Sequence, residues 1–219
     1  MRQPTIWGYA LLTAGGLDSI LTPSEFDSFT AGKWNGDGRI TPNLQAASAA
    51  VRDYCGWHIY PSLQCEVQHT LEDFGFIKTN GRDILVQLPA RYVTEVSEVL
   101  IDATYDSEEE TWTGTACDFS FDTNGLVRIY DVHPYQYSRK TKLVVKYTAG
   151  LPDELAGSIK ELIAHRVIHA LSSPNGVQSE QAGGVSVTYN ATWINNSRAT
   201  ALPDDNKAVL APYRLEEVL

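Results

Sequence analysis

The sequence has few cysteines and no long apolar runs. Its three cysteines, Cys55, Cys65 and Cys117, are too scattered for a disulfide framework, and no two of them form a CxxC pair. We interpret them as buried thiols of a protein in a reducing compartment. With 219 residues, of which 43% are hydrophobic, the chain is long enough to bury a core without metals or disulfides.

Positive charge is also scarce. Seventeen Lys and Arg against 27 Asp and Glu give a formal net charge of -10, which argues against a surface that grips nucleic acid. A protein that merely surrounds DNA can still be acidic. No segment reaches the roughly 18 apolar residues needed to span a bilayer. The apolar patch 6–12 superficially resembles a short signal sequence, but Gly8 interrupts it, and we favour an N-terminal arm or a partner contact.

Helical signals lie toward both ends of the chain. A capping box of Thr22 and Glu25 opens the first predicted helix, and Thr41-Pro42 repeats the cap-then-proline signal before an alanine-rich helix that Gly56 ends. Helical spacing returns after Gly150. The predicted helices cover residues 23–29, 42–55, 152–171 and 204–211.

Between the helices the apolar residues alternate with a period of two. Asn124-Gly125 lies between two alternating stretches and predicts a hairpin with a primed two-residue turn. Further on, residues 176–200 are rich in Gly, Ser, Asn and Thr, with one alternating island, which indicates an extended arm or an exposed hairpin. The predicted strands cover residues 65–71, 84–88, 96–101, 119–122, 126–130 and 143–147.

These patterns predict an α+β protein: helical segments flank a mainly antiparallel β-sheet or barrel subdomain, and the C-terminal part includes an extended arm. Residues 1–63 would hold an N-terminal arm and helices, residues 64–150 the β subdomain, and residues 151–219 a C-terminal helix and the arm.

No stretch carries a strong catalytic or metal-binding motif. His165 and His169, with Glu161 one turn earlier, can share a helix face as a zinc-binding stripe, but the glutamate that follows the first histidine in metalloproteases is missing. We favour ordinary helix-face histidines, and we interpret Cys65 and His69 as core residues of a strand. We therefore expect no enzyme, no cofactor and no metal, although a site assembled from distant residues stays open.

Two polar stretches have a similarly plain interpretation. The run Asn35-Gly-Asp-Gly-Arg39 has the look of a calcium-loop fragment, but it lacks the alternating acids and the closing glutamate, so a turn is favoured. Glu108, Glu109 and Glu110 repel one another, which favours a solvated loop tip over a catalytic cluster.

Several segments taken together resemble the head-to-tail connector proteins, also called adaptor or head completion proteins, of long-tailed phages. The resemblance runs from about Ser24 to the C-terminus, with departures before Thr22 and in the loops 72–83 and 105–114. Five stretches carry it: Tyr54-Cys-Gly-Trp-His-Ile-Tyr-Pro61, Ile84-Leu-Val-Gln-Leu-Pro89 with 96–101, Val145-Lys-Tyr-Thr-Ala-Gly150 with Pro152-Asp-Glu-Leu155, Gln178-Ser-Glu-Gln-Ala-Gly-Gly-Val-Ser-Val-Thr-Tyr189, and Leu210-Ala-Pro-Tyr-Arg-Leu215.

The resemblance implies that the helices form a helical bundle with the β subdomain 64–150 inserted between them, and that residues 151–219 end in a portal-docking tail. It also implies a structural virion protein that acts at the head–tail junction. Such proteins form a ring, usually of twelve subunits, below the portal protein, and they meet a tail-side connector, stopper or tail terminator protein. DNA passes through the lumen without specific binding. Assembly in the host cytoplasm and no membrane contact are expected.

The resemblance also implies contact surfaces. In such proteins the C-terminal segment docks on the portal, which makes Tyr213, Arg214 and Leu215 the candidate portal-binding residues; alternatively they pack the tail onto its own bundle. Residues of the two long helices and the arm are candidates for contacts between subunits, although the helices can instead bury these residues inside one subunit. These candidates are Leu44, Ala47, Val51, Ile159, Ile163, Val187 and Tyr189.

Two other functions remain as alternatives. Trp112, Tyr135 and Tyr137 can stack on sugars if they lie on exposed loops, which would fit a carbohydrate- or receptor-binding virion module. A metal-dependent hydrolase would instead use the Glu161, His165 and His169 stripe.

Overall fold

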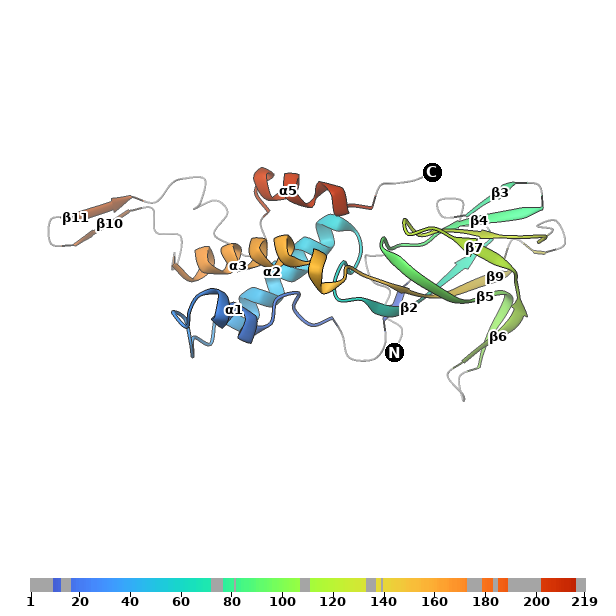
Figure 1. Ribbon diagram of the computed structural model, residues 1–219, viewed down its shortest axis with the longest axis horizontal. Helices are drawn as coiled ribbons and strands as arrows, with labels where there is room; N and C mark the ends of the chain where they lie inside the picture. Colours follow the sequence, from blue (N-terminus) through green and yellow to red (C-terminus); the bar gives the residue numbers. More distant parts are fainter. Residues whose placement is uncertain are drawn as a thin grey trace. The chain divides into compact units, whose positions relative to one another are not determined.

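The computed structural model describes residues 10–12, 17–71, 77–80, 82–106, 111–132, 137–138, 140–172, 179–182, 185–188 and 202–215. Helices and antiparallel strands alternate along the chain in separate blocks, which confirms the predicted α+β class (Figure 1). The chain divides into two compact units. One, the helical unit, comprises Asp18–Tyr54 and Asp153–Pro212; the other, the β unit, comprises Met1–Leu17, Cys55–Pro152 and Tyr213–Leu219.

The helical unit contains the predicted helices. The capping box is confirmed: the Thr22 hydroxyl accepts a hydrogen bond from the Glu25 N–H at 3.2 Å, and the Glu25 carboxylate accepts one from the Thr22 N–H at 2.8 Å. The elements are α1 (Pro23–Phe29), α2 (Ile40–Cys55), the 3-10 turn η2 (Asp153–Leu155), α3 (Gly157–Ser172), α5 (Asp204–Leu210) and the 3-10 turn η4 (Ala211–Tyr213).

Two helix starts differ from the prediction. Helix α2 begins at Ile40 and not at Pro42, because the Asn43 N–H already bonds the Arg39 carbonyl at 3.2 Å. Pro42 thus falls in the first turn, where a missing N–H costs nothing. Helix α3 begins at Gly157 and not at Pro152, because residues 153–155 close a tighter 3-10 turn first.

Glu25 ties α1 to α3. Its carboxylate lies 2.7 Å from the Lys160 ammonium. Burial of the carboxyl raises its pKa, but hydrogen bonds from Lys160 and from Thr22 outweigh this and lower the pKa from 4.5 to about 2. The ionised carboxylate therefore stabilises the fold above a pH of about 4.5, and this stabilisation is lost as the pH falls toward 2.

We predict that Glu25→Gln flattens the dependence of the unfolding free energy on pH between 4.5 and 2. Because the Glu25 side chain is 40% exposed, the expected loss near neutral pH is only about 0.2–1 kcal/mol. Urea unfolding at a series of pH values measures both quantities. Glu154→Gln, at an exposed acid of η2, is the control and should follow the wild-type curve. An unchanged slope in Glu25→Gln would contradict the prediction.

The β unit holds two antiparallel sheets within its described residues. Strands β2, β4, β5, β7, β8 and β9 confirm predicted strands, whereas β3 and β6 have too little apolar alternation to be predicted. The five-stranded sheet has the order β1 (Ala10–Leu12), β2 (Leu63–Thr70), β9 (Lys142–Ala149), β5 (Val93–Asp106), β6 (Thr111–Ala116), and the four-stranded sheet the order β3 (Ile77–Asn80), β4 (Asp83–Gln87), β8 (Leu126–Ile129), β7 (Phe119–Phe121).

Strand β9 is the central strand of the five-stranded sheet. Its residues Leu143, Val144 and Val145 are all fully buried, so both faces of this strand are covered.

Cys65 and His69 on the neighbouring β2 are also buried, as predicted for core residues. Cys55 is buried too, whereas Cys117 is only half-buried, so the prediction of three buried thiols is wrong for Cys117. Burial raises the pKa of the Cys55 and Cys65 thiols to about 12.

The predicted hairpin between β7 and β8 is present, but its turn is longer than predicted. The Asp122 N–H bonds the Leu126 carbonyl at 3.0 Å, which leaves three residues in the loop. Both primed two-residue turns need positive φ at the first central residue, Asn124, but only Gly125 has it, at 86°. A Cβ at Gly125 would also lie 2.5 Å from the Ala90 carbonyl oxygen, so the turn requires glycine.

The arm contains a hairpin of β10 (Ser179–Ala182) and β11 (Val185–Thr188), which confirms one of the two predicted forms. Val187 on β11 pairs with Glu180, so the alternating island has a partner strand within the chain. Tyr189 lies outside the described residues. At the other end, β1 pairs with β2 as an edge strand, so part of the N-terminal arm joins the sheet.

Candidate docking site at the C-terminal tail

The C-terminal tail, Tyr213 to Leu215, lies against the end of helix α2. The Leu215 N–H donates a hydrogen bond to the Cys55 carbonyl oxygen at 2.8 Å. Cys55 is the last residue of α2, and the last carbonyls of a helix have no partner within the helix. The tail therefore supplies a cap for α2 from the far end of the chain.

Trp57 provides the second anchor of the tail. Its side chain is 0% exposed, and its indole N–H donates to the Tyr213 carbonyl oxygen at 2.7 Å. The Trp57 ring stacks on Tyr92, with centroids 6.5 Å apart and planes 10° from parallel, and the Tyr213 ring lies 6.5 Å from Tyr92 on a tilted plane. The tail backbone is thus held by a buried donor within an aromatic cluster of the β unit.

Gly56 lies between these anchors. It ends α2 with a φ of 80°, a conformation that favours glycine. A Cβ placed there would lie 3.6 Å from the Leu215 Cβ, an ordinary van der Waals distance, so the Leu215 side chain lies close to this glycine. The backbone conformation, and not a lack of space, therefore favours glycine at the end of α2.

Arg214 adds charge complementarity. Burial raises the pKa of the Cys55 thiol, and the positive charge of Arg214 opposes this shift, which places the guanidinium near the end of α2. The C-terminal end of a helix carries partial negative charge and is stabilised by a nearby cation. The Arg214 side chain is nevertheless exposed, so it remains accessible to a partner.

The structure thus shows the tail packed on its own chain, against Cys55, Trp57 and Tyr92 of the β unit. This contact fixes the backbone of Tyr213 and Leu215 and leaves both side chains half-buried. Whether these residues also meet the portal stays a prediction. The sequence gives no local signal for Trp57, because its contact with Tyr213 joins positions 156 residues apart.

The candidate residues for contacts between subunits lie mostly in the core. Leu44, Val51, Ile159 and Ile163 are 0% exposed and Ala47 is 1% exposed within the chain. The structure therefore uses these five side chains to hold α2 and α3 in their own unit, which is the alternative that the sequence left open. A contact between copies that involves these helices would have to use their exposed residues. Val187 lies on β11, and Tyr189 is outside the described residues.

Trp112, the main candidate for stacking on a sugar, is buried. Trp112 is only 5% exposed, and its indole N–H bonds the Glu66 carboxylate, while the Lys142 ammonium lies 5.6 Å from its ring. It packs with Leu100 and Val144 in a small core on β6, β5 and β9. Trp112 therefore has no open face for a sugar, Tyr137 is half-buried, and Tyr135 lies outside the described residues.

The histidine stripe shows an ordinary helix surface. His165 lies 3.6 Å from Glu161 with both side chains more than half exposed, and its ring makes an edge contact with Phe29. Burial and the charges of Arg166 and His165 lower the pKa of His169. The described residues contain no group of three His, Cys, Asp or Glu side chains arranged to hold a metal.

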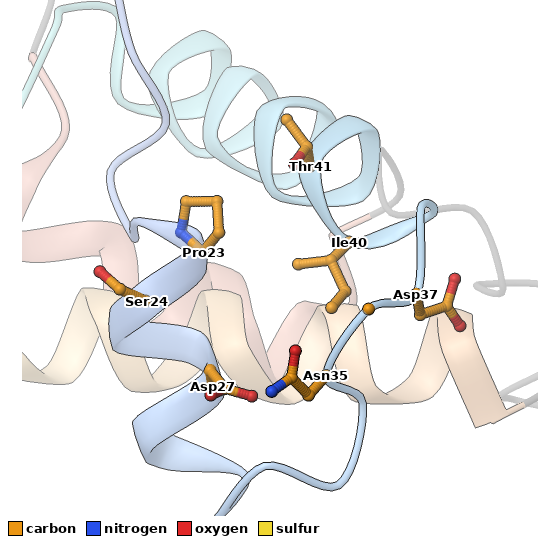
Figure 2. Close-up of a pocket in the computed structure, with 8 residues that line it drawn as sticks. Pro23, Ser24, Asp27, Asn35, Asp37, Ile40 and Thr41 are labelled. Atoms are coloured by element: carbon orange, nitrogen blue, oxygen red, sulfur yellow. The ribbon is translucent and has the colours of Figure 1, made fainter.

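A shallow cleft of about 330 Å³ lies between α1 and the start of α2 (Figure 2). The side chains of Asp27 and Asn35 point toward one another there, whereas the Asp37 carboxylate points away. Asp37 bonds the Arg39 guanidinium and backbone N–H, which lower its pKa to about 2. The run Asn35 to Arg39 is thus a turn closed by its own ion pair, as predicted.

Comparisons with known proteins address the chain as a whole. Residues 19–215 match the family described as "HCP: Head completion protein". Among the curated proteins, none matches the chain. No helix within the described part of the chain is long and apolar enough to cross a membrane.

Two solved structures share the fold, each over 96% of this chain and 97% of their own. One is described as "Neck of empty GTA particle computed with C6 symmetry", with 19% identity and a TM-score of 0.53. The other is described as "Neck of native GTA particle computed with C12 symmetry", with 16% identity and a TM-score of 0.50.

Proposed function

The chain belongs to the head completion protein family, and from this premise we propose that it is the adaptor that forms a ring below the portal of a phage-like virion. A head–tail connector role follows from the family itself. The observation that carries the proposal is the extent of the match, which runs from residue 19 to residue 215 and so covers most of both units, including Tyr213 to Leu215 of the tail.

The ring is the first specific part of the proposal. The two similar neck structures were computed with sixfold and twelvefold symmetry, and we propose a closed ring of twelve copies for this chain. Each copy in such a ring presents one surface to the next copy and a different surface to the previous one. Because the candidate residues of α2 and α3 are buried, we propose that the exposed residues of these helices and the β10–β11 hairpin form the contacts.

The tail is the second part. We propose that the exposed side chain of Arg214, in the tail that lies against the end of α2, binds the portal protein together with the side chains of Tyr213 and Leu215. Tyrosine and arginine suit this role because they combine large contact area with directional hydrogen bonds. The opposite end of the ring would meet a tail-side connector, stopper or tail terminator protein, which places the protein at the head–tail junction of a virion assembled in the host cytoplasm.

DNA passage is the third part. DNA must slide through the ring during packaging and ejection, and a lumen that bound phosphate would slow it. The net charge of -10 disfavours such binding.

Mutual repulsion between the acidic copies is screened over about 8 Å at physiological salt. This repulsion would keep free copies apart until the portal gathers them.

Electron microscopy of the protein mixed with its portal tests the proposal. We expect a ring of copies coaxial with the portal, with the C-terminal tails at the contact. Portal particles that carry no circular assembly under conditions of excess adaptor would contradict it. The ionic strength should be varied in the same experiment, because a ring of acidic subunits should form more readily as salt screens their repulsion.

A further inference from the structure

We propose that Trp57, Gly56 and the C-terminal carbonyl of α2 form an acceptor site for the tail, and that Trp57 is a positioning residue for portal binding. This inference rests on the proposed function. It assigns a role to residues outside the segment 213–215 and explains how a short tail acquires a fixed direction. Within the site, Trp57 bonds the Tyr213 carbonyl and Cys55 accepts from the Leu215 N–H.

The two hydrogen bonds flank Arg214. One fixes the carbonyl of the residue before it, at 2.7 Å, and the other fixes the N–H of the residue after it, at 2.8 Å. Both use backbone atoms of the tail, so they hold the chain path, and the Arg214 side chain between them is exposed. A side chain whose backbone is already ordered loses less conformational entropy when it binds a partner.

The acceptor side of the site is rigid. Trp57 is fully buried and packs edge-on against His58, with ring centroids 5.4 Å apart, in addition to its stack on Tyr92. The His58 Nε2 atom lies 2.8 Å from the Ala149 carbonyl oxygen of β9, the central strand. The position of the indole N–H is therefore set by the core of the β unit. The tail, in turn, takes its position from that core.

The ligand of the site is the chain's own C-terminal segment. Four contacts hold the tail in the site. They are the bonds to the Tyr213 carbonyl and the Leu215 N–H, the Leu215 side chain beside Gly56, and the Arg214 charge near the end of α2. Such a set of contacts is specific enough to hold a segment that is covalently attached, because attachment gives a high effective concentration. We infer that the site sets the direction of the tail in the free subunit before the portal is met.

Trp57→Phe tests this assignment. The substitution keeps an aromatic ring but removes the N–H donor, so we expect the Leu215 amide to exchange its hydrogen about threefold to tenfold faster, as for the loss of one hydrogen bond. Portal binding should weaken by a similar factor. Trp112→Phe is the matched control, because it removes another buried indole N–H donor, which bonds the Glu66 carboxylate and not the tail. It should leave both readouts unchanged.

A second pair of variants tests the site from the tail side and does not depend on the folding of Trp57→Phe. Leu215→Pro removes the N–H that bonds Cys55, whereas Leu215→Ala keeps it and shortens the side chain. If the acceptor site positions the tail, Leu215→Pro should weaken portal binding several-fold more than Leu215→Ala. Equal binding by the two variants would overturn the inference.

The outcomes separate the inference from the function on which it rests. If the wild-type chain binds the portal and Trp57→Phe binds equally tightly with a faster-exchanging Leu215 amide, the inference is wrong and the proposed function stands. If the wild-type chain forms no complex with the portal, the proposed function itself fails. Hydrogen exchange on the free subunit reports on the acceptor site in either case, and an unchanged Leu215 amide in Trp57→Phe would refute it.

Discussion

A chain that ends at Pro212 is expected to fold and to lose its association with the portal. The truncation removes Tyr213 and Leu215, so the buried Trp57 N–H and the Cys55 carbonyl lose their partners. Leaving a buried donor without a partner costs about 1–3 kcal/mol, which is smaller than the 5–15 kcal/mol that stabilise a typical domain. Thermal unfolding followed by circular dichroism and copurification with the portal measure the two effects.

Arg214→Ala provides the control for this truncation. Arg214 is exposed, so the substitution should change the unfolding free energy by no more than about 0.5 kcal/mol. It should nevertheless weaken portal binding if its side chain is a contact. Undiminished portal binding by the chain that ends at Pro212 would count directly against a docking role of the tail, whatever Arg214→Ala does.

The second large effect is expected from Leu44→Ala in the core of the helical unit. Leu44 is 0% exposed within the chain, so the substitution should lower the unfolding free energy of an isolated subunit by about 2–5 kcal/mol. Ile163→Ala on α3 should have an effect of the same size for the same reason. Urea unfolding at low protein concentration, where no ring is present, measures the loss.

Gln45→Ala is the matched control on α2. Gln45 is adjacent to Leu44 but exposed, so its substitution should stay within about 0.5 kcal/mol of the wild type. If Leu44→Ala instead left the isolated subunit as stable as the wild type and prevented ring formation, Leu44 would belong to a contact between copies. The burial of this side chain predicts the opposite result.

Local signals in the sequence predicted the elements well where one short stretch decides the structure. The capping box of Thr22 and Glu25 and the stop at Gly56 depend on residues within one helical turn, and both are confirmed. The hairpin at Asn124-Gly125 is confirmed as well, but its type is not, because the three-residue loop is set by the bond between Asp122 and Leu126. The dipeptide Asn124-Gly125 alone does not show that Asp122 pairs with Leu126.

The candidate site required information that periodicity does not carry. The family resemblance pointed to Tyr213, Arg214 and Leu215, but their partners Trp57 and Cys55 lie in a distant part of the chain. Helical spacing correctly placed Leu44 and Ile163 on the apolar faces of their respective helices, and it could not tell whether the same subunit or another copy covers those faces. Only the three-dimensional structure shows that the subunit covers them itself.

The bond between Trp57 and Tyr213 joins residues that leave the ribosome at very different times, since they are 156 positions apart. During translation the Trp57 N–H therefore lacks this partner until Tyr213 has been synthesised. A polypeptide that terminates prematurely, or that a protease shortens from its end, never closes this contact and is expected to be passed over when particles mature. The same few residues would thus act as a check that only intact copies are incorporated.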